Sequence, residues 1–259
     1  MTGWKCSVCG YVWNGSKPPK NCPQCGSPSG EFSKSGTKAR LEVRQYDVLL
    51  INGSSHRSHN TAILADIAEA ELKKKGLTCA RIDLNGLEIQ HCWCCYSMSD
   101  ADCTYPCRNQ LDDMPALHEM IVKSKAVIVA SPINWNNMSA RLKDFLDRLT
   151  ALQNQTLLGK KSLTAGKVLG ILVNGHEDGA MKTAMDIFVY FQQMGFIMAP
   201  FGFAYATHGA GNNANTDNEY FKGDKKLRGD IAGLVNNVAE MLGQNLERKM
   251  KGKLVSVSE

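Results

Sequence analysis

The sequence contains no apolar run near the roughly 20 residues that span a bilayer, so no membrane segment is predicted. The apolar core of a signal peptide is also missing, because residues 4–25 are polar and rich in Gly, Pro and Cys. We therefore expect a cytoplasmic protein. In such a reducing compartment, the ten cysteines of the chain indicate metal or redox chemistry rather than disulfides.

The net charge of +5 lies entirely in residues 1–44, which hold seven basic residues against two acidic ones. This basic segment indicates either a solvated surface or docking to an acidic partner protein or a neighbouring subunit. No recognition helix and no aromatic–basic platform accompany the charge, so nucleic-acid binding is not expected.

The chain divides into three parts. Residues 1–32 show no helical period, and we expect turns around four cysteines, followed by a small, polar and basic linker at residues 33–44. Over residues 45–259, strand and helix patterns alternate, which predicts an α/β fold with a doubly wound parallel sheet in the flavodoxin-like strand order 2-1-3-4-5. The expected strands are 46–52, 78–84, 126–130, 167–174 and 196–204, and the expected helices are 60–75, 112–124, 139–152, 179–194 and 224–248.

Two Cys-x-x-Cys pairs near the N-terminus predict a metal site. Cys6 and Cys9 form the first pair, and Cys22 and Cys25 form the second, so four thiolates are available to one tetrahedral ion. A glycine follows each pair, where a positive φ is often required and backbone N–H groups can point at sulfur. The spacing suits iron and structural zinc alike, and both interpretations stay open at this point.

The same segment resembles the rubredoxin-like domain found at the end of rubrerythrins. The shared features are Trp4 before the first pair, a Gly-Tyr after it, a Pro-Pro, the Cys-Pro-x-Cys-Gly of the second pair, and Phe32. The resemblance implies a single iron that cycles between the ferric and ferrous states and is held by Cys6, Cys9, Cys22 and Cys25.

A Ser-rich loop at residues 53–61 follows the first predicted strand and precedes a predicted helix. It contains neither GK[ST] nor GxGxxG. Unpaired N–H groups and the helix dipole make such a helix N-terminus attractive to anions. The hydroxyls of Ser54, Ser58 and Thr61, with the amide of Asn60, can complete a phosphate cradle, although loops of this kind can also serve only to cap the helix.

Two further loops, at residues 131–139 and 174–179, follow the third and fourth predicted strands. All three loops lie at the carboxyl ends of parallel strands, where open α/β sheets bind ligands. The loop at 131–139 offers a proline turn, an aromatic side chain and amides that can meet the polar edge of a flat heterocycle. Together the loops predict sites for a phosphate, a ring edge and a ring face, whereas each alone is consistent with packing or capping.

These motifs resemble those of the NADPH-dependent FMN reductase-like flavoproteins, a family that includes the iron–sulfur flavoproteins. GSxxxxxNT follows the first strand, and SPINWNNMSARLKDFLDR follows the third. The resemblance implies FMN as cofactor, NAD(P)H as reductant, and a homodimer or homotetramer around the flavin. It also implies a phosphate site made by Ser54, His56, Arg57, Ser58, Asn60 and Thr61, and an isoalloxazine site made by Pro132, Ile133, Asn134, Trp135, Asn136, Asn174, Gly175 and His176.

Five cysteines gather at residues 92–107, between the second predicted strand and the next helix. Iron–sulfur flavoproteins carry a compact cysteine motif in this loop, and the resemblance implies a [4Fe–4S] cluster, although Met98 occupies the position of the third ligand. The alternative is a loop that keeps its thiols for redox chemistry without a cluster. A cubane would take Cys92, Cys95, Cys103 and Cys107 as its ligands.

These features predict an electron-transfer flavoprotein oxidoreductase. FMN would take two electrons from NAD(P)H, and the N-terminal iron would carry them singly to an unidentified acceptor, such as a redox partner protein. Two alternatives remain: a non-enzymatic carrier that another reductase feeds, and a redox-sensing interaction protein with structural zinc. The sequence indicates no catalytic general acid.

Overall fold

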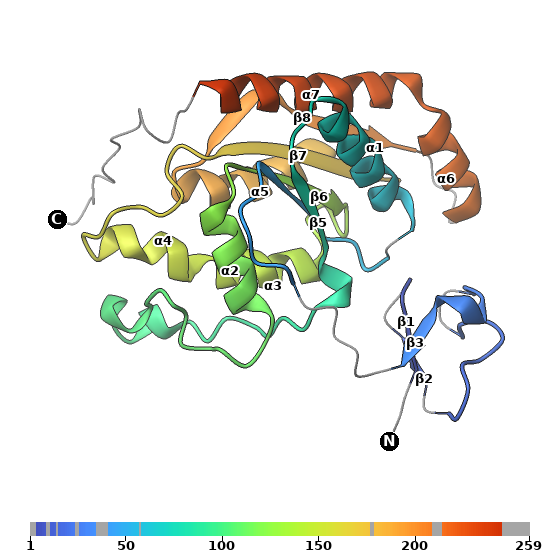
Figure 1. Cartoon of the computed structure of the whole chain (residues 1–259), viewed down its shortest axis with the longest axis horizontal. Helices are drawn as coiled ribbons and strands as arrows, with labels where there is room; N and C mark the ends of the chain where they lie inside the picture. The colour runs from blue at the N-terminus through green and yellow to red at the C-terminus, as the bar shows by residue number, and fades with distance from the viewer. Residues whose placement is uncertain are drawn as a thin grey trace.

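The computed structural model of the chain describes residues 4–8, 11–13, 15–23, 26–34, 41–56, 58–176, 179–208 and 214–244. It contains a small N-terminal sheet and a larger α/β domain (Figure 1). No helix in these residues combines the length and the apolarity that crossing a membrane requires.

Three short antiparallel strands build the N-terminal module, which we define as the described residues from 4 to 34. They lie in the order β2-β1-β3, where the sequence predicted only turns. The module has a small core made by Cys6, Val8, Cys22 and Phe32. Domains with so little buried apolar surface usually need a metal or disulfides to fold. The elements are β1 (Trp4–Cys6), β2 (Val12–Trp13), the 3-10 helix η1 (Ser29–Glu31) and β3 (Phe32–Lys34).

Five parallel strands in the order β5-β4-β6-β7-β8 form the sheet of the larger domain, which confirms the predicted flavodoxin-like order 2-1-3-4-5. Every residue of β4 is buried, because helices cover both faces of the sheet, and this explains its continuous apolar sequence. The register aligns Asn52, the last residue of β4, with Asp83 and Ala130 on the neighbouring strands. The strands are β4 (Val48–Asn52), β5 (Cys79–Asp83), β6 (Ala126–Pro132), β7 (Val168–Gly175) and β8 (Ile197–Thr207).

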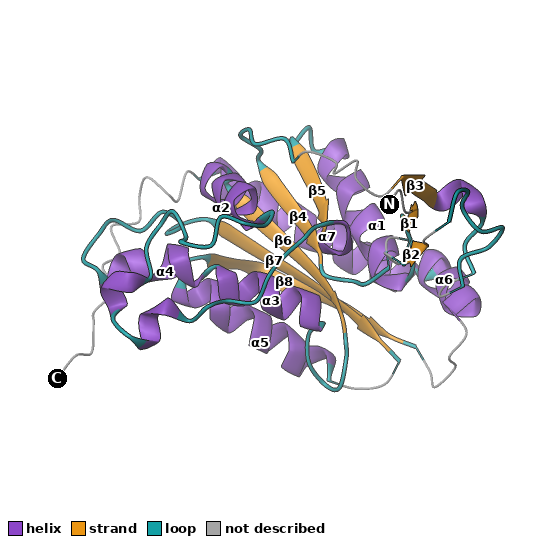
Figure 2. Ribbon diagram, turned by 90° about the horizontal axis from the view of Figure 1, so that it is seen from below, coloured by secondary structure: helices purple, strands orange, loops and turns teal. Residues whose placement is uncertain are grey.

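The helices form two layers, one on each face of the sheet (Figure 2). Helices α1 and α7 pack on the face that carries Leu50 and Ile128. Helices α2, α3 and α5 pack on the opposite face, with Leu49 and Val127, because alternate strand residues point to opposite faces. The helices are α1 (Asn60–Lys74), α2 (Met114–Lys123), α3 (Ala140–Arg148), α4 (Thr150–Leu157), α5 (Ala180–Gln193), α6 (Ala214–Gly223) and α7 (Lys225–Gly243), with short 3-10 helices η2 (Leu84–Gly86), η3 (Cys95–Ser97) and η4 (Asp100–Asp102).

Two helical regions differ from the sequence prediction. The helix expected over 139–152 is divided at Leu149 into α3 and α4, where the Thr150 hydroxyl donates to the Asp147 carbonyl oxygen at 2.7 Å. Helix α6 was not predicted, because its segment is rich in Gly, Asn and Asp, which favour loops. Phe221 of α6 is fully buried in the core, so tertiary packing overrides the local preference.

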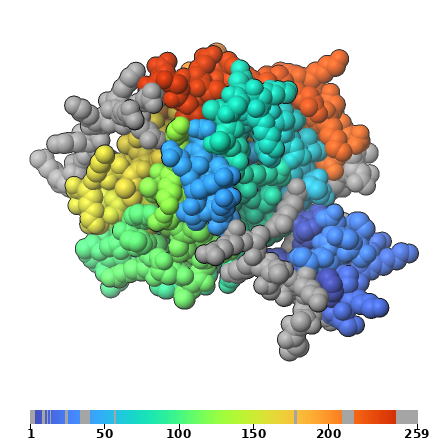
Figure 3. Space-filling model, viewed as in Figure 1, coloured from blue at the N-terminus to red at the C-terminus, as the bar shows by residue number. Residues whose placement is uncertain are grey.

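The C-terminal end of the predicted linker is packed on the larger domain. Leu41 contacts the core, and the buried Tyr46 donates its hydroxyl to Glu42 at 3.4 Å. The Arg44 guanidinium lies 4.8 Å from the centre of the Tyr46 ring. In the space-filling view, the N-terminal module lies against the lower edge of the larger domain (Figure 3).

Candidate functional site

The loops after β4, β6 and β7 lie at one edge of the sheet. The register pairs Asn52 with Ala130 and Pro132 with Asn174, so the three strands end side by side. This edge includes the point between β4 and β6 where the strand order reverses, and ligands of doubly wound sheets bind there. The structure thus brings together the loops that the sequence predicts for phosphate and ring binding.

The loop that follows β4 is held in place by hydrogen bonds to its backbone. The Gly53 N–H donates to the Ala130 carbonyl oxygen at 2.8 Å, and the Ser139 hydroxyl donates to the Gly53 carbonyl oxygen at 2.5 Å. A Cβ at Gly53 would lie only 2.9 Å from Leu142 Cβ, so only glycine fits this approach of the loop to α3. Ser54 is buried, and its hydroxyl accepts from the His56 N–H at 3.0 Å.

Within the part of the chain that the structure describes, the same loop has polar atoms that bond to no protein group. His59 is the N-cap of α1, and its side chain makes no capping bond to the first amides of this 15-residue helix. His56 Nδ1 and Asn60 Oδ1 are buried and have no hydrogen-bond partner among the described residues. The Asn60 amide can turn over and present its NH₂ donors instead. Unused polar atoms at an uncapped helix N-terminus fit an anionic group such as the phosphate of FMN.

Two stacked imidazoles border this helix end. The rings of His56 and His59 lie 4.4 Å apart at an angle of 19°. Burial lowers the pKa of both rings, and for His59 the neighbouring His56 lowers it further, so both are neutral at pH 7. His59 was missed from the sequence, where only its place before a predicted helix marked it. Arg57, the remaining predicted phosphate contact of basic character, lies outside the described residues.

Thr61 joins the phosphate loop to the loop after β7. Its hydroxyl donates to Asn174 Oδ1 at 2.7 Å, and both side chains are buried. The structure therefore places Thr61 in a contact between two of the predicted loops. Ser58 lies exposed beside them. His176, the first residue after β7, has its Nε2 3.5 Å from Asp217 Oδ2 of α6.

The loop after β6 forms a tight turn that presents Trp135 to solvent. Asn134 and Asn137 exchange backbone hydrogen bonds of 2.7 and 3.0 Å, and both central residues have positive φ, 51° at Trp135 and 57° at Asn136. Asparagine tolerates this conformation, whereas a bulky residue such as Trp135 is strained in it. The Trp135 side chain is 99% exposed and lies beside a hollow of about 670 Å³, which Ile133, Asn134, Met138 and Lys143 also line.

Two glycines, Gly175 and Gly179, allow the turn at residues 134–137 to pack closely against the neighbouring loop. A Cβ at Gly175 would lie 2.7 Å from Ile133 Cδ1, and a Cβ at Gly179 would lie 2.4 Å from Asn136 Oδ1. Both positions therefore require glycine for the loops to meet. A strained, exposed aromatic beside an open hollow offers a flat surface for a ring, and this fits the isoalloxazine of FMN.

Four of the five cysteines in the loop after β5 line one small hollow. These are Cys92, Cys95, Cys103 and Cys107, the predicted cluster ligands, and Arg148 lines the hollow with them. Burial raises the pKa of Cys92, and burial followed by the neighbouring cysteines raises the pKa of Cys103 to about 11. No three metal-ligating side chains within the described ranges gather at the spacing that a single ion needs. The structure therefore brings the four predicted cluster ligands to one hollow.

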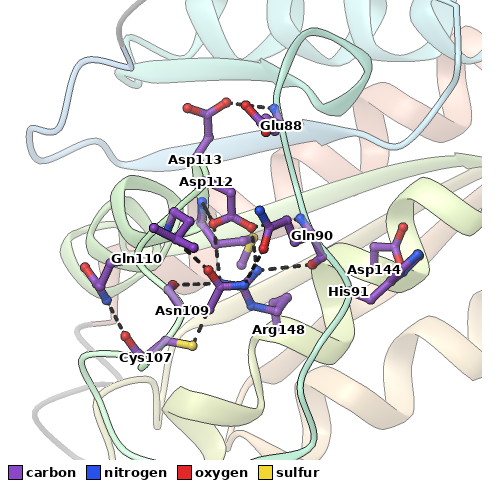
Figure 4. A network of polar contacts seen from close by, with 12 residues as sticks. Glu88, Gln90, His91, Cys107, Asn109, Gln110, Asp112, Asp113, Asp144 and Arg148 are labelled. Carbon is purple, nitrogen blue, oxygen red and sulfur yellow. Dashed lines mark hydrogen bonds and ion pairs between the residues drawn. The ribbon is translucent and has the colours of Figure 1, made fainter.

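A buried arginine connects this cysteine loop to the domain (Figure 4). Arg148 is 1% exposed, and its guanidinium contacts Asp112 Oδ2 at 2.5 Å. It also donates to the carbonyl oxygens of Gln90 and Asn109, at 3.1 and 3.0 Å, and lies 3.8 Å from Cys107 Sγ. Burial disfavours the charge, but the bonds to Asp112 outweigh it and raise the pKa of Arg148. The sequence indicated no functional role for Asp112, and Arg148 was quoted only as the last residue of the motif after the third strand.

His118 of α2 completes the network around Arg148. Its Nε2 lies 2.8 Å from the Arg148 carbonyl oxygen, and because a carbonyl can only accept, Nε2 carries the proton. Burial lowers the pKa of His118 to about 4, so the ring is neutral at pH 7. Its Nδ1 is buried and has no partner in the described ranges.

In the N-terminal module, Cys6 and Cys22 come together in the core, at 1% and 3% exposure. The Cys6 N–H donates to the Tyr11 carbonyl oxygen at 2.8 Å, and the Gly26 N–H donates to the Cys22 carbonyl oxygen at 2.9 Å, so both segments turn tightly. Cys9 and Cys25 lie outside the described residues. Two buried thiols in facing turns, each followed by a second cysteine in the sequence, fit a four-thiolate ion site.

Comparison with known proteins finds a matching family for each of the two parts of the chain. Residues 46–211 match the family of NADPH-dependent FMN reductases, and residues 4–33 match the rubredoxin-like domain of rubrerythrin. The chain is 31% identical over 112 residues to an iron–sulfur flavoprotein of Archaeoglobus fulgidus, which covers 42% of this chain and 49% of that protein. It is 27% identical over 205 residues to another from the same organism, which covers 78% of this chain and 97% of that protein.

Among solved structures, RosB with the bound intermediate 8-demethyl-8-formylriboflavin-5'-phosphate aligns with 80% of this chain and 82% of its own, with a TM-score of 0.63 and 22% sequence identity. This likeness supports the flavodoxin-like fold. The family match covers well over half of the sequence, and it agrees with the three loops at the carboxyl edge of the sheet. The chain belongs to the NADPH-dependent FMN reductase family and carries a rubredoxin-like domain of the rubrerythrin type ahead of it.

Proposed function

We propose that this protein is an NAD(P)H-dependent FMN oxidoreductase that passes electrons through its N-terminal iron to a separate acceptor. The observation that carries the proposal is the uncapped N-terminus of α1, with unpartnered atoms of His56 and Asn60, at the same sheet edge as the Trp135 turn. FMN takes a hydride from a nicotinamide and can release electrons singly, whereas a four-thiolate iron carries one electron at a time.

The residues of the chain divide this task. Ser54, Ser58 and Asn60, with the amides of α1, would hold the phosphate of FMN. The turn at Pro132, Ile133, Asn134, Trp135 and Asn136 would lie along the ring, with Asn174, Gly175 and His176 beside it. Cys6, Cys9, Cys22 and Cys25 would hold iron. Thr61 keeps the phosphate and ring loops in register through Asn174.

Replacing Ser54 or Asn60 by alanine is expected to weaken FMN binding by about 10- to 100-fold each, because each variant removes a partner of a charged phosphate. Titration of FMN into the apoprotein measures the effect. Ser124→Ala is the matched control for Ser54→Ala: Ser124 is also buried, but it precedes β6 at the amino edge of the sheet. Unchanged affinity in both site variants, or a cofactor that migrates as FAD, contradicts the assignment.

Anaerobic addition of NADH or NADPH decides between the enzyme and the carrier. In the proposed enzyme, one of the two nucleotides bleaches the flavin absorbance. If neither does so while dithionite does, the protein is a carrier fed by another reductase. Stoichiometric zinc in protein produced with ample iron would instead favour the redox-sensing alternative.

A second cofactor is favoured by the cysteine hollow. We propose that Cys92, Cys95, Cys103 and Cys107 hold a [4Fe–4S] cluster, with Arg148 balancing part of its negative charge. Met98 is 86% exposed and takes no part.

Anaerobic reconstitution with iron and sulfide tests the cluster. We expect about four inorganic sulfides per chain, in keeping with a cubane. Cys95→Ser should abolish them, whereas Cys94→Ser should not, because Cys94 does not line the hollow. Absence of sulfide in the reconstituted wild-type protein would leave the loop as a thiol site without a cluster.

A further inference from the structure

We infer that Asn85 holds the N-terminal module in one position against the larger domain, and that electrons therefore pass from flavin to iron within one chain. The inference rests on the proposed function. Its basis is a hydrogen bond between the two parts: Asn85 Nδ2 donates to the Val8 carbonyl oxygen at 3.4 Å. Both residues are buried, at 9% and 6% exposure.

Val8 lies inside the first cysteine pair, between Cys6 and Cys9. Its carbonyl belongs to the turn that carries two of the four proposed iron ligands. A contact at this turn therefore places the ligand loop itself, rather than a remote face of the module, against the larger domain. Buried polar groups in proteins are hydrogen-bonded, so this contact ties the ligand turn to the larger domain.

Asn85 lies at the carboxyl edge of the sheet, as the candidate flavin site does. It sits in η2, which directly follows β5. Asp83, two residues earlier, accepts from Asn52 Nδ2 at 2.8 Å, and Asn52 Oδ1 in turn accepts from the Ser54 N–H at 3.1 Å. The support of Asn85 is therefore linked by two hydrogen bonds to the loop proposed to hold the phosphate of FMN.

The tether between the two parts is short. The module ends with β3 at Lys34, and Leu41 is the first described residue that packs on the core of the larger domain. Seven Cα-to-Cα intervals therefore separate the two parts. Fully extended, they span at most about 25 Å. The module is thus confined near the edge of the larger domain of the same chain. The Asn85 contact selects one position of the module within the reach of the tether.

Two variants of Asn85 test its proposed role. Asn85→Asp keeps the shape, removes the donor and sets a carboxylate against the Val8 carbonyl, while Asn85→Leu removes the hydrogen bond without adding charge. We expect flavin reduction by nucleotide or dithionite to be unchanged, and electron transfer from flavin to iron to slow by about tenfold. Ser7→Ala is the matched control, because Ser7 neighbours Val8 but bonds within the module, to Glu31. Its transfer rate should match the wild type.

A second readout does not depend on electron transfer. Small-angle scattering of the metal-loaded full chain should give a larger radius of gyration for Asn85→Asp than for the wild type and Ser7→Ala. If both Asn85 variants keep the wild-type radius of gyration and electron-transfer rate, the proposed role of Asn85 is wrong. A transfer rate in the wild type that rises with protein concentration would overturn transfer within one chain. If iron in the wild type is never reduced by the flavin, the proposed function fails. The radius of gyration still tests whether Asn85 holds the module against the larger domain.

Discussion

Replacing Arg148 by alanine is expected to lower the free energy of unfolding by about 3–5 kcal/mol, the typical effect of removing one partner of a buried ion pair. Asp112, whose side chain is fully buried, would lose its ion-pair partner. The carbonyl oxygens of Gln90 and Asn109 would also lose their donor. Urea denaturation at saturating FMN measures the change as a shift of the midpoint.

Two further variants separate the mechanism from a general effect of substitution. Arg141→Ala, in the first turn of the same helix, should change stability by no more than about 0.5 kcal/mol, because Arg141 is partly exposed. The double variant Arg148→Met with Asp112→Leu should recover much of the loss, because it leaves no unpaired charge. If Arg148→Ala is as stable as Arg141→Ala, the buried pair contributes nothing to folding and this interpretation fails.

Replacing Cys22 by serine in the full chain is expected to remove the N-terminal metal and unfold the N-terminal module alone. The core of the module consists of Cys6, Val8, Cys22 and Phe32, and two of these four are proposed ligands. Binding of a structural metal contributes about 10–16 kcal/mol in comparably small four-ligand domains, so little structure should remain without it. Hydrogen exchange should become fast across residues 4–34 and stay slow in the central strands β4 and β6.

Metal analysis accompanies the exchange measurement. Wild-type protein should contain one metal ion that Cys22→Ser lacks, and the flavin spectrum should be the same in both. Cys79→Ala is the control, because Cys79 lies in β5, where burial raises its pKa to about 12 and keeps it a neutral thiol. It should retain the metal. A Cys22→Ser protein with its full metal content would exclude Cys22 as a ligand.

Much of the architecture could be predicted from the sequence, because its signals are local. Continuous apolar runs identified the buried strands, and alternation with helical patterns gave the flavodoxin-like order. The predictions failed where local preference and tertiary packing disagree. Polar, Asn-rich α6 is held by burial of Phe221, and the predicted helix divides into α3 and α4 where the Thr150 hydroxyl bonds to the Asp147 carbonyl oxygen.

The candidate site divides in the same way. The Ser-rich loop, the proline turn and the cysteine pairs were recognisable because each motif lies within a few consecutive residues. Their completion was not, because it depends on partners far away in the chain. Thr61 meets Asn174, and Arg148 meets Asp112, across separations of 113 and 36 residues.

The sequence by itself therefore determined the parts of this protein: a four-cysteine module, an FMN reductase-type domain and a cysteine-rich loop between strand and helix. Only the tertiary structure decided how the parts meet, through the buried Arg148, the stacked His56 and His59, and Asn85 against Val8. The physical reason is that periodicity and short motifs record the conformation of neighbouring residues. A buried ion pair or a single hydrogen bond between distant segments leaves no such pattern in the sequence. Such a contact forms only when the chain folds and excludes water from both partners.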